Sequence, residues 1–261
     1  MPLSAIEQLP RATRQQIRTI FTDLDDTLTR DGLVEAAAFA ALWRAADAGL
    51  QVIVVTGRPA GWCDHLARMW PVAAVVGENG ALAFARRAGR MRRIYANRPS
   101  DARARLDAIA EQVLAEVPRA RVAADQAYRE HELAIDFCEE VSPPLDEAQI
   151  DRIAAIFAAH GATAKVSSIH VNGWFGAHDK LSMCRRCCEE LLGVPFAPQH
   201  ATFVGDSPND VPMFRAFPHA VGVANVRALA HRMDALPAYV TRAPGGAGFA
   251  EVVDLLLEGS G

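Results

Sequence analysis

Residues 17–27 read IRTIFTDLDDT, an apolar run followed at once by acidic residues. The run Ile17–Phe21 predicts a short buried strand that ends just before Asp23. Asp23, Asp25 and Asp26 then place three carboxylates within four residues. Open parallel sheets bind their ligands at the carboxyl ends of the strands. We therefore expect a ligand site at the end of this first strand.

Helical and strand-like patterns alternate after this stretch. Val52–Val55 and Val72–Val76 have the pattern of strands, while Ala36–Ala48 and Trp62–Met69 have the apolar spacing of helices. This alternation favours a parallel sheet with right-handed crossovers, the Rossmann-like type of α/β fold. It resumes late in the chain, with helices predicted at Asp179–Leu192, Val211–Phe217 and Phe249–Leu257 and strands at Thr202–Val204, Ala220–Val223 and Ala238–Thr241.

The residues between these two parts have a different pattern. Ala81–Ala85 and Arg92–Tyr95 flank a short turn and predict a hairpin. We expect residues 1–82 and 176–261 to form a Rossmann-like core, and residues 83–175 to form an inserted α+β cap domain. The cap is predicted to contain helices at Asp101–Glu116 and Leu145–Ala159 and strands at Leu133–Phe137, Ala164–Ser168 and Ile169–Phe175.

The composition is typical of a soluble globular protein. The 261 residues carry a formal net charge of −4, so we expect neither nucleic acid nor a membrane surface as a partner. No apolar run approaches the roughly 18 residues that cross a bilayer. The start of the chain contains no apolar segment of a secretory signal. We expect a cytoplasmic monomer or homodimer with reduced cysteine thiols, acting on a small molecule.

Asp23 and Asp25 have the residue types and spacing of a carboxylate pair that transfers a phosphoryl group. Two residues apart in a nearly extended chain, their side chains can point to the same side. One carboxylate can attack phosphorus while the other protonates the leaving oxygen and later activates water. Mg²⁺ would neutralise the crowded carboxylates and the phosphoryl oxygens. The alternative is a solvated turn in which an aspartate caps a helix.

Two further segments place phosphate-binding residue types near strand ends or helix starts. Thr56 and Gly57 follow the second strand, where a hydroxyl and free backbone amides can hold a phosphate. Arg58 is either a substrate contact or a surface residue. Lys180 lies at a predicted helix start, which is electrostatically unfavourable for a cation and suggests an anionic partner. The alternatives are an ordinary helix cap for Thr56 and a solvated side chain for Lys180.

The segment Gly205–Asp210 reads GDSPND and follows another predicted strand. Asp206 is a candidate metal ligand. Asn209 and Asp210 are candidates for orienting Lys180, water or phosphate. The alternative is an Asx or proline turn. The four motifs nevertheless follow one another along the chain as an acid pair, a hydroxyl, a lysine and a second acid pair. Each lies at a strand end or a helix start, and loop composition alone rarely produces that order.

These four motifs together resemble those of the haloacid dehalogenase superfamily. The motif that reads GENGA, residues 77–81, is similar to its Cof-like branch with a type-IIB cap. That branch includes sucrose-phosphate, mannosyl-3-phosphoglycerate and trehalose-phosphate phosphatases, as well as eukaryotic phosphomannomutases. The motifs cover both ends of the chain, and the insert falls where this branch carries its cap.

The resemblance implies a role for each acidic motif residue. Asp23 would be the nucleophile and a metal ligand, and Asp25 the general acid/base with its backbone carbonyl on the metal. Asp206 would complete the protein ligands. Asp26 is a departure, because much of the branch has glycine there. An acid at position 25 argues against dehalogenation, which needs neither that acid nor Mg²⁺.

The same resemblance implies how the phosphoryl group is held. Thr56, Gly57 and Lys180 would bind it, and Asn209 would contact it or support Lys180. Asp210 would act behind the metal ligands or bind the metal through water.

Substrate recognition is assigned to the cap. If residues 169–174 form a strand, then His170, Asn172 and Trp174 share one face and suit a polyhydroxylated ligand. Arg58 is a further candidate contact. The alternative for the strand is a polar exposed sheet face.

We therefore predict a Mg²⁺-dependent phosphohydrolase acting through an aspartyl-phosphate intermediate. Its substrate would be a small phosphorylated metabolite, a sugar phosphate or a glycosyl-phosphoglycerate. One alternative is a phosphosugar mutase, because Gly173-Trp174 lies a few residues before Lys180, as in phosphomannomutases. A second alternative is a non-catalytic binding domain.

Overall fold

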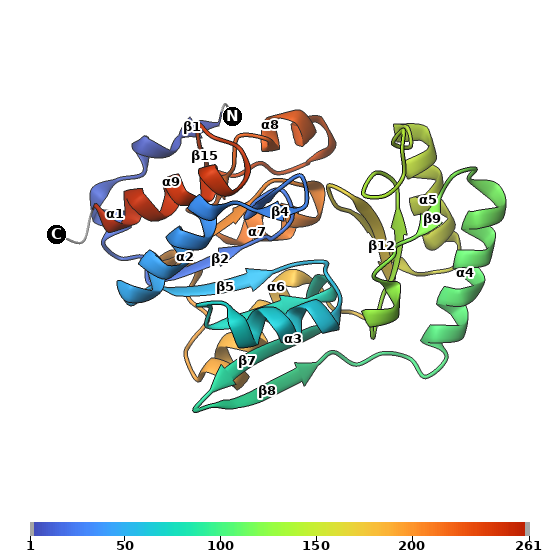
Figure 1. Cartoon of the computed structure of the whole chain (residues 1–261), viewed down its shortest axis with the longest axis horizontal. Helices are drawn as coiled ribbons and strands as arrows, with labels where there is room; N and C mark the ends of the chain where they lie inside the picture. Colours follow the sequence, from blue (N-terminus) through green and yellow to red (C-terminus); the bar gives the residue numbers. More distant parts are fainter. Residues whose placement is uncertain (1–2, 259–261) are drawn as a thin grey trace.

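A nine-stranded sheet forms the larger of two α/β units in the computed structural model, which describes residues 3–258 (Figure 1). Its strands lie in the order β1-β15-β14-β13-β2-β5-β6-β7-β8. All neighbours from β1 to β6 pair in parallel, and β7 and β8 complete the sheet as an antiparallel hairpin. The strands are β1 Ser4–Ala5, β2 Thr19–Thr22, β5 Gln51–Val55, β6 Ala74–Gly77, β7 Leu82–Arg87, β8 Arg90–Tyr95, β13 Ala201–Gly205, β14 Val221–Gly222 and β15 Tyr239–Val240.

The expected Rossmann-like fold is confirmed, and the apolar runs explain it. Val52 and Val54 of β5 pack on one face of the sheet with α2, α3 and α9, while Ile53 and Val55 pack on the other with α6 and α7. A strand that is buried on both faces needs a continuous apolar run, which is the pattern found in the sequence. The helices are α1 Arg11–Arg14, α2 Ala36–Asp47, α3 Ala60–Met69, α6 Lys180–Arg186, α7 Val211–Ala216, α8 Val226–Leu229 and α9 Gly245–Leu257.

Two helices differ from their predicted form. The helix predicted at Asp179–Leu192 is α6 followed by a π-helix at Cys187–Leu192, for which the sequence contains no marker. Helix α9 begins at Gly245 rather than Phe249. A Cβ at Gly246 would lie 2.8 Å from the Leu28 carbonyl oxygen, so this turn is glycine-rich because it packs against backbone.

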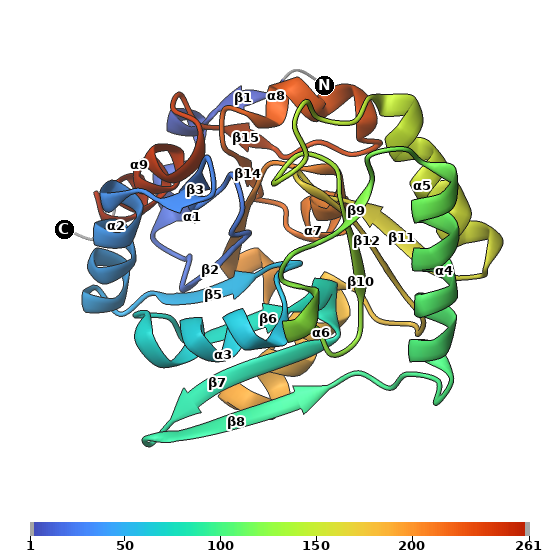
Figure 2. The same cartoon turned by 45° about the vertical axis from the view of Figure 1, so that its right-hand side comes forward.

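The smaller unit is a four-stranded antiparallel sheet in the order β11-β12-β10-β9. Its helices cover the face that points away from the larger unit (Figure 2). Gly173 of β12 allows this packing, because a Cβ there would lie 2.1 Å from the Phe157 ring of α5. The elements are α4 Ala102–Glu116, β9 Arg121–Val122, β10 Leu133–Asp136, α5 Glu147–Ala159, β11 Thr163–Val166 and β12 His170–Trp174.

The chain leaves the large sheet later than the predicted boundary at residue 82. Strand β7 pairs with β6, and β8 pairs with β7 as far as Tyr95. The predicted hairpin therefore exists, but it belongs to the core rather than to the insert. The change in composition near residue 81 marks the switch from parallel to antiparallel pairing, which the sequence pattern does not distinguish from a domain boundary.

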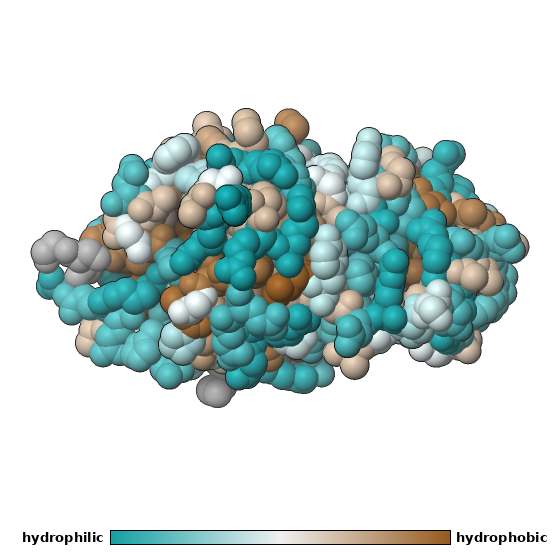
Figure 3. Space-filling view, turned by 90° about the horizontal axis from the view of Figure 1, so that it is seen from below, coloured by the Kyte–Doolittle hydropathy of each residue, from teal (hydrophilic) through white to brown (hydrophobic). Residues whose placement is uncertain are grey.

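Strand β8 is the edge of the large sheet and is strongly charged. Arg90, Arg92 and Arg93 are all exposed on it. Hydrophilic side chains cover most of the underside of the molecule, where β8 lies (Figure 3). Charges along an edge strand oppose pairing with another chain. Within residues 3–258, no helix combines the length and apolar character that crossing a membrane requires.

A short hairpin lies beyond β2 and was not predicted. It consists of β3 Thr29–Arg30 and β4 Leu33–Val34. Gly32 has φ +75 in its turn, a conformation that favours glycine.

Candidate active site

The site lies at the carboxyl ends of the central parallel strands, which point toward the smaller unit (Figure 1). Thr22, the last residue of β2, is in register with Val204 on one side and Val54 on the other. The loops that begin after these residues carry the predicted motifs. The register therefore brings Asp23, Thr56 and Asp206 to one edge of the sheet.

Three buried carboxylates, those of Asp23, Asp206 and Asp210, have oxygens within 4.8 Å of one another. Burial, followed by the Asp210 charge, raises the pKa of Asp23 well above its usual value. Burial and Asp210 likewise raise the pKa of Asp206. Buried like charges at this distance are unfavourable unless a cation joins them, so this donor set fits a hard divalent cation.

Lys180 is the cation nearest to this cluster. Its Nζ lies 2.6 Å from Asp210 Oδ1 and 3.2 Å from Asp23 Oδ1. Burial favours the neutral amine, but the Asp210 and Asp23 carboxylates outweigh it and raise the pKa of Lys180. Lys180 therefore stays charged. A capping box between Asp179 and Ser182 starts α6 and places Lys180 in its first turn.

Both carboxylate oxygens of Asp210 accept hydrogen bonds, one of them from Lys180. Its Oδ1 accepts from Lys180, and its Oδ2 accepts from the backbone N–H groups of Asp206 and Ser207. The turn predicted at residues 205–210 is therefore real, and Asp210 organises it. Asp210 positions Lys180 and Asp206 from behind the cluster.

Asp206 is oriented by two side chains, one of which was missed from the sequence. Its Oδ1 accepts from the Thr27 hydroxyl at 3.1 Å, and its Oδ2 accepts from Asn225 Nδ2 at 3.0 Å. Asn225 also donates to the Asp26 carbonyl and accepts from the Gly245 N–H. It lies just after β14, so the strand-end rule that indicated the other residues would have found it.

Thr56, Gly57 and Asn209 line the same edge. Thr56 is fully buried, and its hydroxyl accepts from the Arg58 N–H at 3.0 Å. A Cβ at Gly57 would lie 3.0 Å from the side chain of Asn79, so the two residues pack closely. Asn209 Nδ2 donates to Asn79 Oδ1 at 3.3 Å. The Thr-Gly turn and the Ser-Pro-Asn turn are thus joined through Asn79.

Arg58 is buried and paired, rather than free for substrate. Its guanidinium contacts Asp25 at 2.9 Å, Asp125 at 3.3 Å and Glu139 at 2.6 Å. Burial opposes its charge, but Asp25 and Glu139 outweigh burial and raise the pKa of Arg58. Its Cζ also lies 4.4 Å from the centroid of the Trp62 ring. Arg58 therefore links the core to the smaller unit.

Of the residues predicted to contact substrate from the cap, two lie at the site and one does not. His170 Nε2 lies 2.9 Å from Glu139 Oε2, and Asn172 Nδ2 donates to Glu132 Oε2 at 2.9 Å. Both face the core. Trp174, expected on the same ligand-facing side, is instead buried: its ring stacks on His178 at 5.4 Å, and its Nε1 donates to the His178 carbonyl. Trp174 instead packs where the chain returns to the core.

These side chains enclose a cavity between the two units of ≈ 10 Å³, which is about the space of one water molecule. No phosphorylated metabolite fits into it, so the structure is a closed arrangement. Its lining residues are Asp23, Asp25, Gly57, Arg58, Ser167, Ser168, Ile169, His170, Asn172 and Asn209.

Glu78 joins the units and was not assigned a role from the sequence. Its carboxylate accepts from four backbone N–H groups, those of Ala60, Glu130, His131 and Glu132. Glu78 has φ 43, a conformation that residues other than glycine rarely adopt. The GENGA motif therefore contains the residue that holds the segment 130–132 against the core.

Asp26, the departure from the glycine of the branch, also contacts the smaller unit. It has φ 55, in the region that favours glycine. Its N–H donates to Thr29 Oγ1 at 2.9 Å, and its side chain bonds with that of Ser168. Burial raises the pKa of Asp26, and the Ser168 hydrogen bond opposes this. The aspartate thus adopts the positive φ that this turn requires, and its side chain adds a contact that glycine lacks.

Comparison with known proteins agrees with this geometry. A family model described as haloacid dehalogenase-like hydrolase matches residues 20–132. A phosphoglycolate phosphatase from Pyrobaculum neutrophilum is 29% identical over 250 residues, which cover 93% of this chain and 96% of the relative.

Solved structures share the fold over nearly the whole chain. A Thermoplasma acidophilum protein superposes with a TM-score of 0.70 at 20% identity, over 92% of this chain and 98% of that one. The sucrose-phosphatase of Synechocystis, solved with sucrose and phosphate, has a TM-score of 0.63 at 14% identity, over 93% of this chain and 98% of that one.

Proposed function

We propose that the chain is a phosphatase of the haloacid dehalogenase-like hydrolases, a Mg²⁺-dependent enzyme that forms an aspartyl-phosphate on Asp23. Its substrate is a sugar phosphate or a glycosyl-phosphoglycerate. The observation that carries this proposal is the buried cluster of Asp23, Asp206 and Asp210 with Lys180 at 3.2 Å from Asp23.

Asp23 is arranged to present one carboxylate oxygen. Its Oδ1 accepts from the Leu24 N–H at 2.9 Å and lies beside Lys180. Within residues 3–258, the structure gives Oδ2 no hydrogen-bond donor. An oxygen that is not engaged keeps its lone pairs for attack on phosphorus, while Lys180 binds the phosphoryl oxygens.

Asp25 acts on the leaving group. As Asp23 Oδ2 bonds to phosphorus, the bond from phosphorus to the substrate oxygen breaks and that oxygen takes the proton of Asp25. Asp25 then removes a proton from water, which attacks the aspartyl-phosphate and releases inorganic phosphate with Asp23 restored. In the closed structure Asp25 pairs with Arg58, so Arg58 must release it before it can carry a proton.

Asp23, Asp206 and the backbone carbonyl of Asp25 are the residues that would hold Mg²⁺. The ion, when bound, neutralises charge on the carboxylates and on the transferring phosphoryl group. Asp210 has both oxygens engaged, which supports a role behind the ligands. Thr56, Gly57 and Asn209 complete the phosphoryl site, and the cap contributes His170 and Asn172.

The two similar proteins whose activity is named are both phosphatases, which does not favour the mutase alternative. Release of inorganic phosphate from a hexose monophosphate, without any requirement for a bisphosphate, separates the two activities. A panel of several dozen phosphorylated metabolites would identify the substrate.

Replacing the nucleophile tests the mechanism. Asp23→Asn removes the attacking carboxylate but keeps the shape of the side chain, so turnover of p-nitrophenyl phosphate with Mg²⁺ should fall by at least about 10³-fold. Circular dichroism checks the fold, and Asp47→Asn, at an exposed position on α2, is the matched control. EDTA should abolish wild-type activity, and Mg²⁺ should restore it. An active Asp23→Asn enzyme, or full activity in EDTA, would refute the proposal.

A further inference from the structure

Glu139 lies on the loop after β10, beside Arg58 and His170, two of the residues that line the cavity. Asp136 holds this loop, because its side chain accepts from the backbone N–H groups of Cys138, Glu139 and Glu140 at 2.8 to 2.9 Å. The Asp136 side chain is buried, whereas that of Glu139 is 29% exposed. The backbone of Glu139 is therefore fixed, and its carboxylate reaches the boundary between the units.

The Glu139 carboxylate is charged at neutral pH. One oxygen lies 2.6 Å from Arg58 Nη2, and the other lies 2.9 Å from His170 Nε2. Burial favours the neutral acid, but the neighbouring His170 and Arg58 side chains outweigh it and lower the pKa of Glu139 to about 2. A substrate that enters between the units thus meets a carboxylate that is held between Arg58 and His170.

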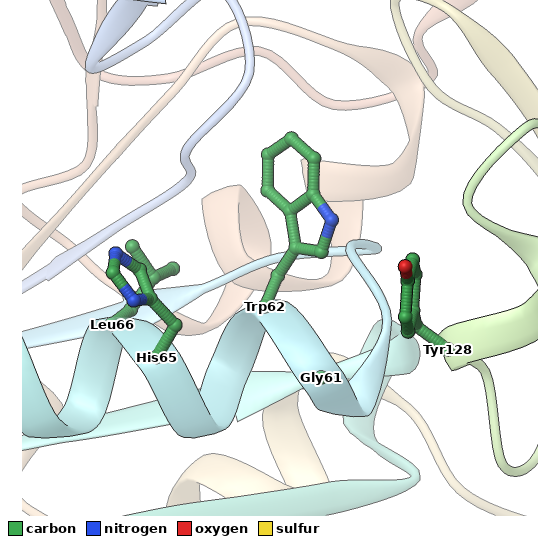
Figure 4. A pocket seen from close by; sticks show the side chains of 5 residues that line it. All are labelled: Gly61, Trp62, His65, Leu66 and Tyr128. Carbon is green, nitrogen blue, oxygen red and sulfur yellow. The ribbon is translucent and has the colours of Figure 1, made fainter.

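Among the residues described around the cavity, Arg58 and Lys180 are already engaged by carboxylates. Arg58 is shared by Asp25, Asp125 and Glu139 and stacks on Trp62, the ring seen face-on in Figure 4. Lys180 is paired with Asp23 and Asp210 in the carboxylate cluster. When Arg58 releases Asp25 for proton transfer, Asp125 and Glu139 still engage its guanidinium.

Four further polar side chains line the cavity. Ser167, Ser168, His170 and Asn172 line the cavity with hydroxyl, imidazole and amide groups. Such groups exchange hydrogen bonds with hydroxyls. A carboxylate there would face Glu139 instead, and like charges in a partly buried site repel one another strongly.

We infer that Glu139 is a specificity-determining residue, which accepts hydrogen bonds from substrate hydroxyls and rejects leaving groups that carry a carboxylate. The inference rests on the proposed function and narrows it. Of the two substrate classes named above, it selects the phosphate ester of an uncharged, hydroxyl-rich leaving group. It also predicts that phosphoglycolate, the compound in the name of the Pyrobaculum neutrophilum relative, is a poor substrate for this chain.

Matched substrate pairs test this inference. Glycerol 3-phosphate and 3-phosphoglycerate differ by a CH₂OH group in place of a carboxylate, as do 2-hydroxyethyl phosphate and phosphoglycolate. For the wild type with Mg²⁺, we expect kcat/KM to be at least about 100-fold higher for the hydroxyl member of each pair, as polar sites discriminate between such ligands. In Glu139→Gln this ratio should fall at least about tenfold, mainly through a lower KM for the carboxylated member.

Two comparisons make the outcome decisive. Glu140→Gln, which neutralises the exposed neighbouring carboxylate, should keep the wild-type ratio. A wild type that hydrolyses p-nitrophenyl phosphate through Asp23 but prefers the carboxylated substrates would overturn the inference alone. An unchanged ratio in Glu139→Gln would also overturn it. A wild type that fails on p-nitrophenyl phosphate would refute the proposed function, and the inference with it.

Discussion

Asn225 illustrates how a single uncharged side chain organises a cluster of acids. Its amide donates to Asp206 and to the Asp26 carbonyl, and its Oδ1 accepts from the Gly245 N–H. The side chain thereby ties the candidate metal ligand Asp206 to the turn after β2 and to the start of α9. Groups that orient metal ligands in this way strongly affect metal affinity.

Removing that amide should lower the affinity for Mg²⁺ more than it lowers the rate of the reaction at saturating Mg²⁺. In Asn225→Ala, Asp206 loses a donor and becomes free to rotate, so the Mg²⁺ concentration for half-maximal activity should rise about 10- to 100-fold. Activity at saturating Mg²⁺ should largely return. Mg²⁺ titrations of phosphatase activity measure this effect, with Asn97→Ala, at an exposed position, as the control. An unchanged Mg²⁺ dependence would contradict the role given to Asn225.

At the scale of elements, Glu78 connects the 3-10 turn Glu78–Gly80 to the segment 130–132 and to the start of α3. One carboxylate satisfies four backbone donors that belong to segments far apart in the chain. Charge-assisted hydrogen bonds of this kind are stronger than neutral ones. The contact explains why a charged residue is buried here beside a turn.

Changing this acceptor should loosen the connection. In Glu78→Gln, the amide NH₂ group would face two backbone N–H donors, and leaving buried donors unpaired costs about 2 kcal/mol or more. Hydrogen exchange should then be faster at Glu130, His131 and Glu132, while the amides of β5 stay protected. Equal protection in the variant and the wild type would show that the carboxylate does not hold this segment.

At the scale of the whole molecule, the cavity of ≈ 10 Å³ requires the two units to separate before substrate enters. The chain crosses between them twice, at residues 96–101 and 175–179. Gly176 has φ +127, and a Cβ there would lie 2.9 Å from the Asn97 carbonyl, so the two crossings are tightly packed together. Closure then excludes water from the reaction.

A reversible cross-link should test this motion. Gly61 of α3 and Tyr128 of the smaller unit face each other at the cleft in Figure 4, and a Cβ at Gly61 would lie 3.1 Å from the Tyr128 Cβ. Disulfides span similar Cβ separations of about 3.5–4.5 Å. Gly61→Cys combined with Tyr128→Cys should lose activity on oxidation and regain it with dithiothreitol.

The single variants serve as controls for the cross-link. Each alone should be insensitive to oxidation, because burial raises the pKa of the native thiols Cys63 and Cys184 and makes them unreactive. Full activity of the oxidised double variant would show that the units need not separate.

Local sequence patterns were enough to predict the sheet and the motif positions. The run Val52–Val55 is apolar throughout because both of its faces are buried. A helix is predicted between it and Ile17–Phe21, and that alternation indicated parallel pairing. Parallel strands end at one edge of a sheet, so residues placed at those ends come together. That reasoning indicated Asp23, Thr56 and Asp206 without any knowledge of distances.

Pairings between distant residues could not be predicted in this way. Arg58 and Glu139 are 81 positions apart, and neither belongs to a pattern that marks the other. The edge of the core at Tyr95 was missed for the same reason, because a hairpin carries no sign of which sheet it joins. Hydrogen bonds and ion pairs depend on atoms within a few ångströms, and only the packed chain defines those separations.

The sequence by itself therefore determined the parallel sheet, the inserted unit and the acidic residues at the strand ends, because burial and strand direction leave local, periodic marks. Only the tertiary structure decided how those residues are connected. It paired Asp25 with Arg58, linked Arg58 to Glu139, and set Asn225 behind Asp206. The reason is physical: periodic burial is a property of each segment, whereas charge pairing across a closed boundary is a property of two segments and the space between them.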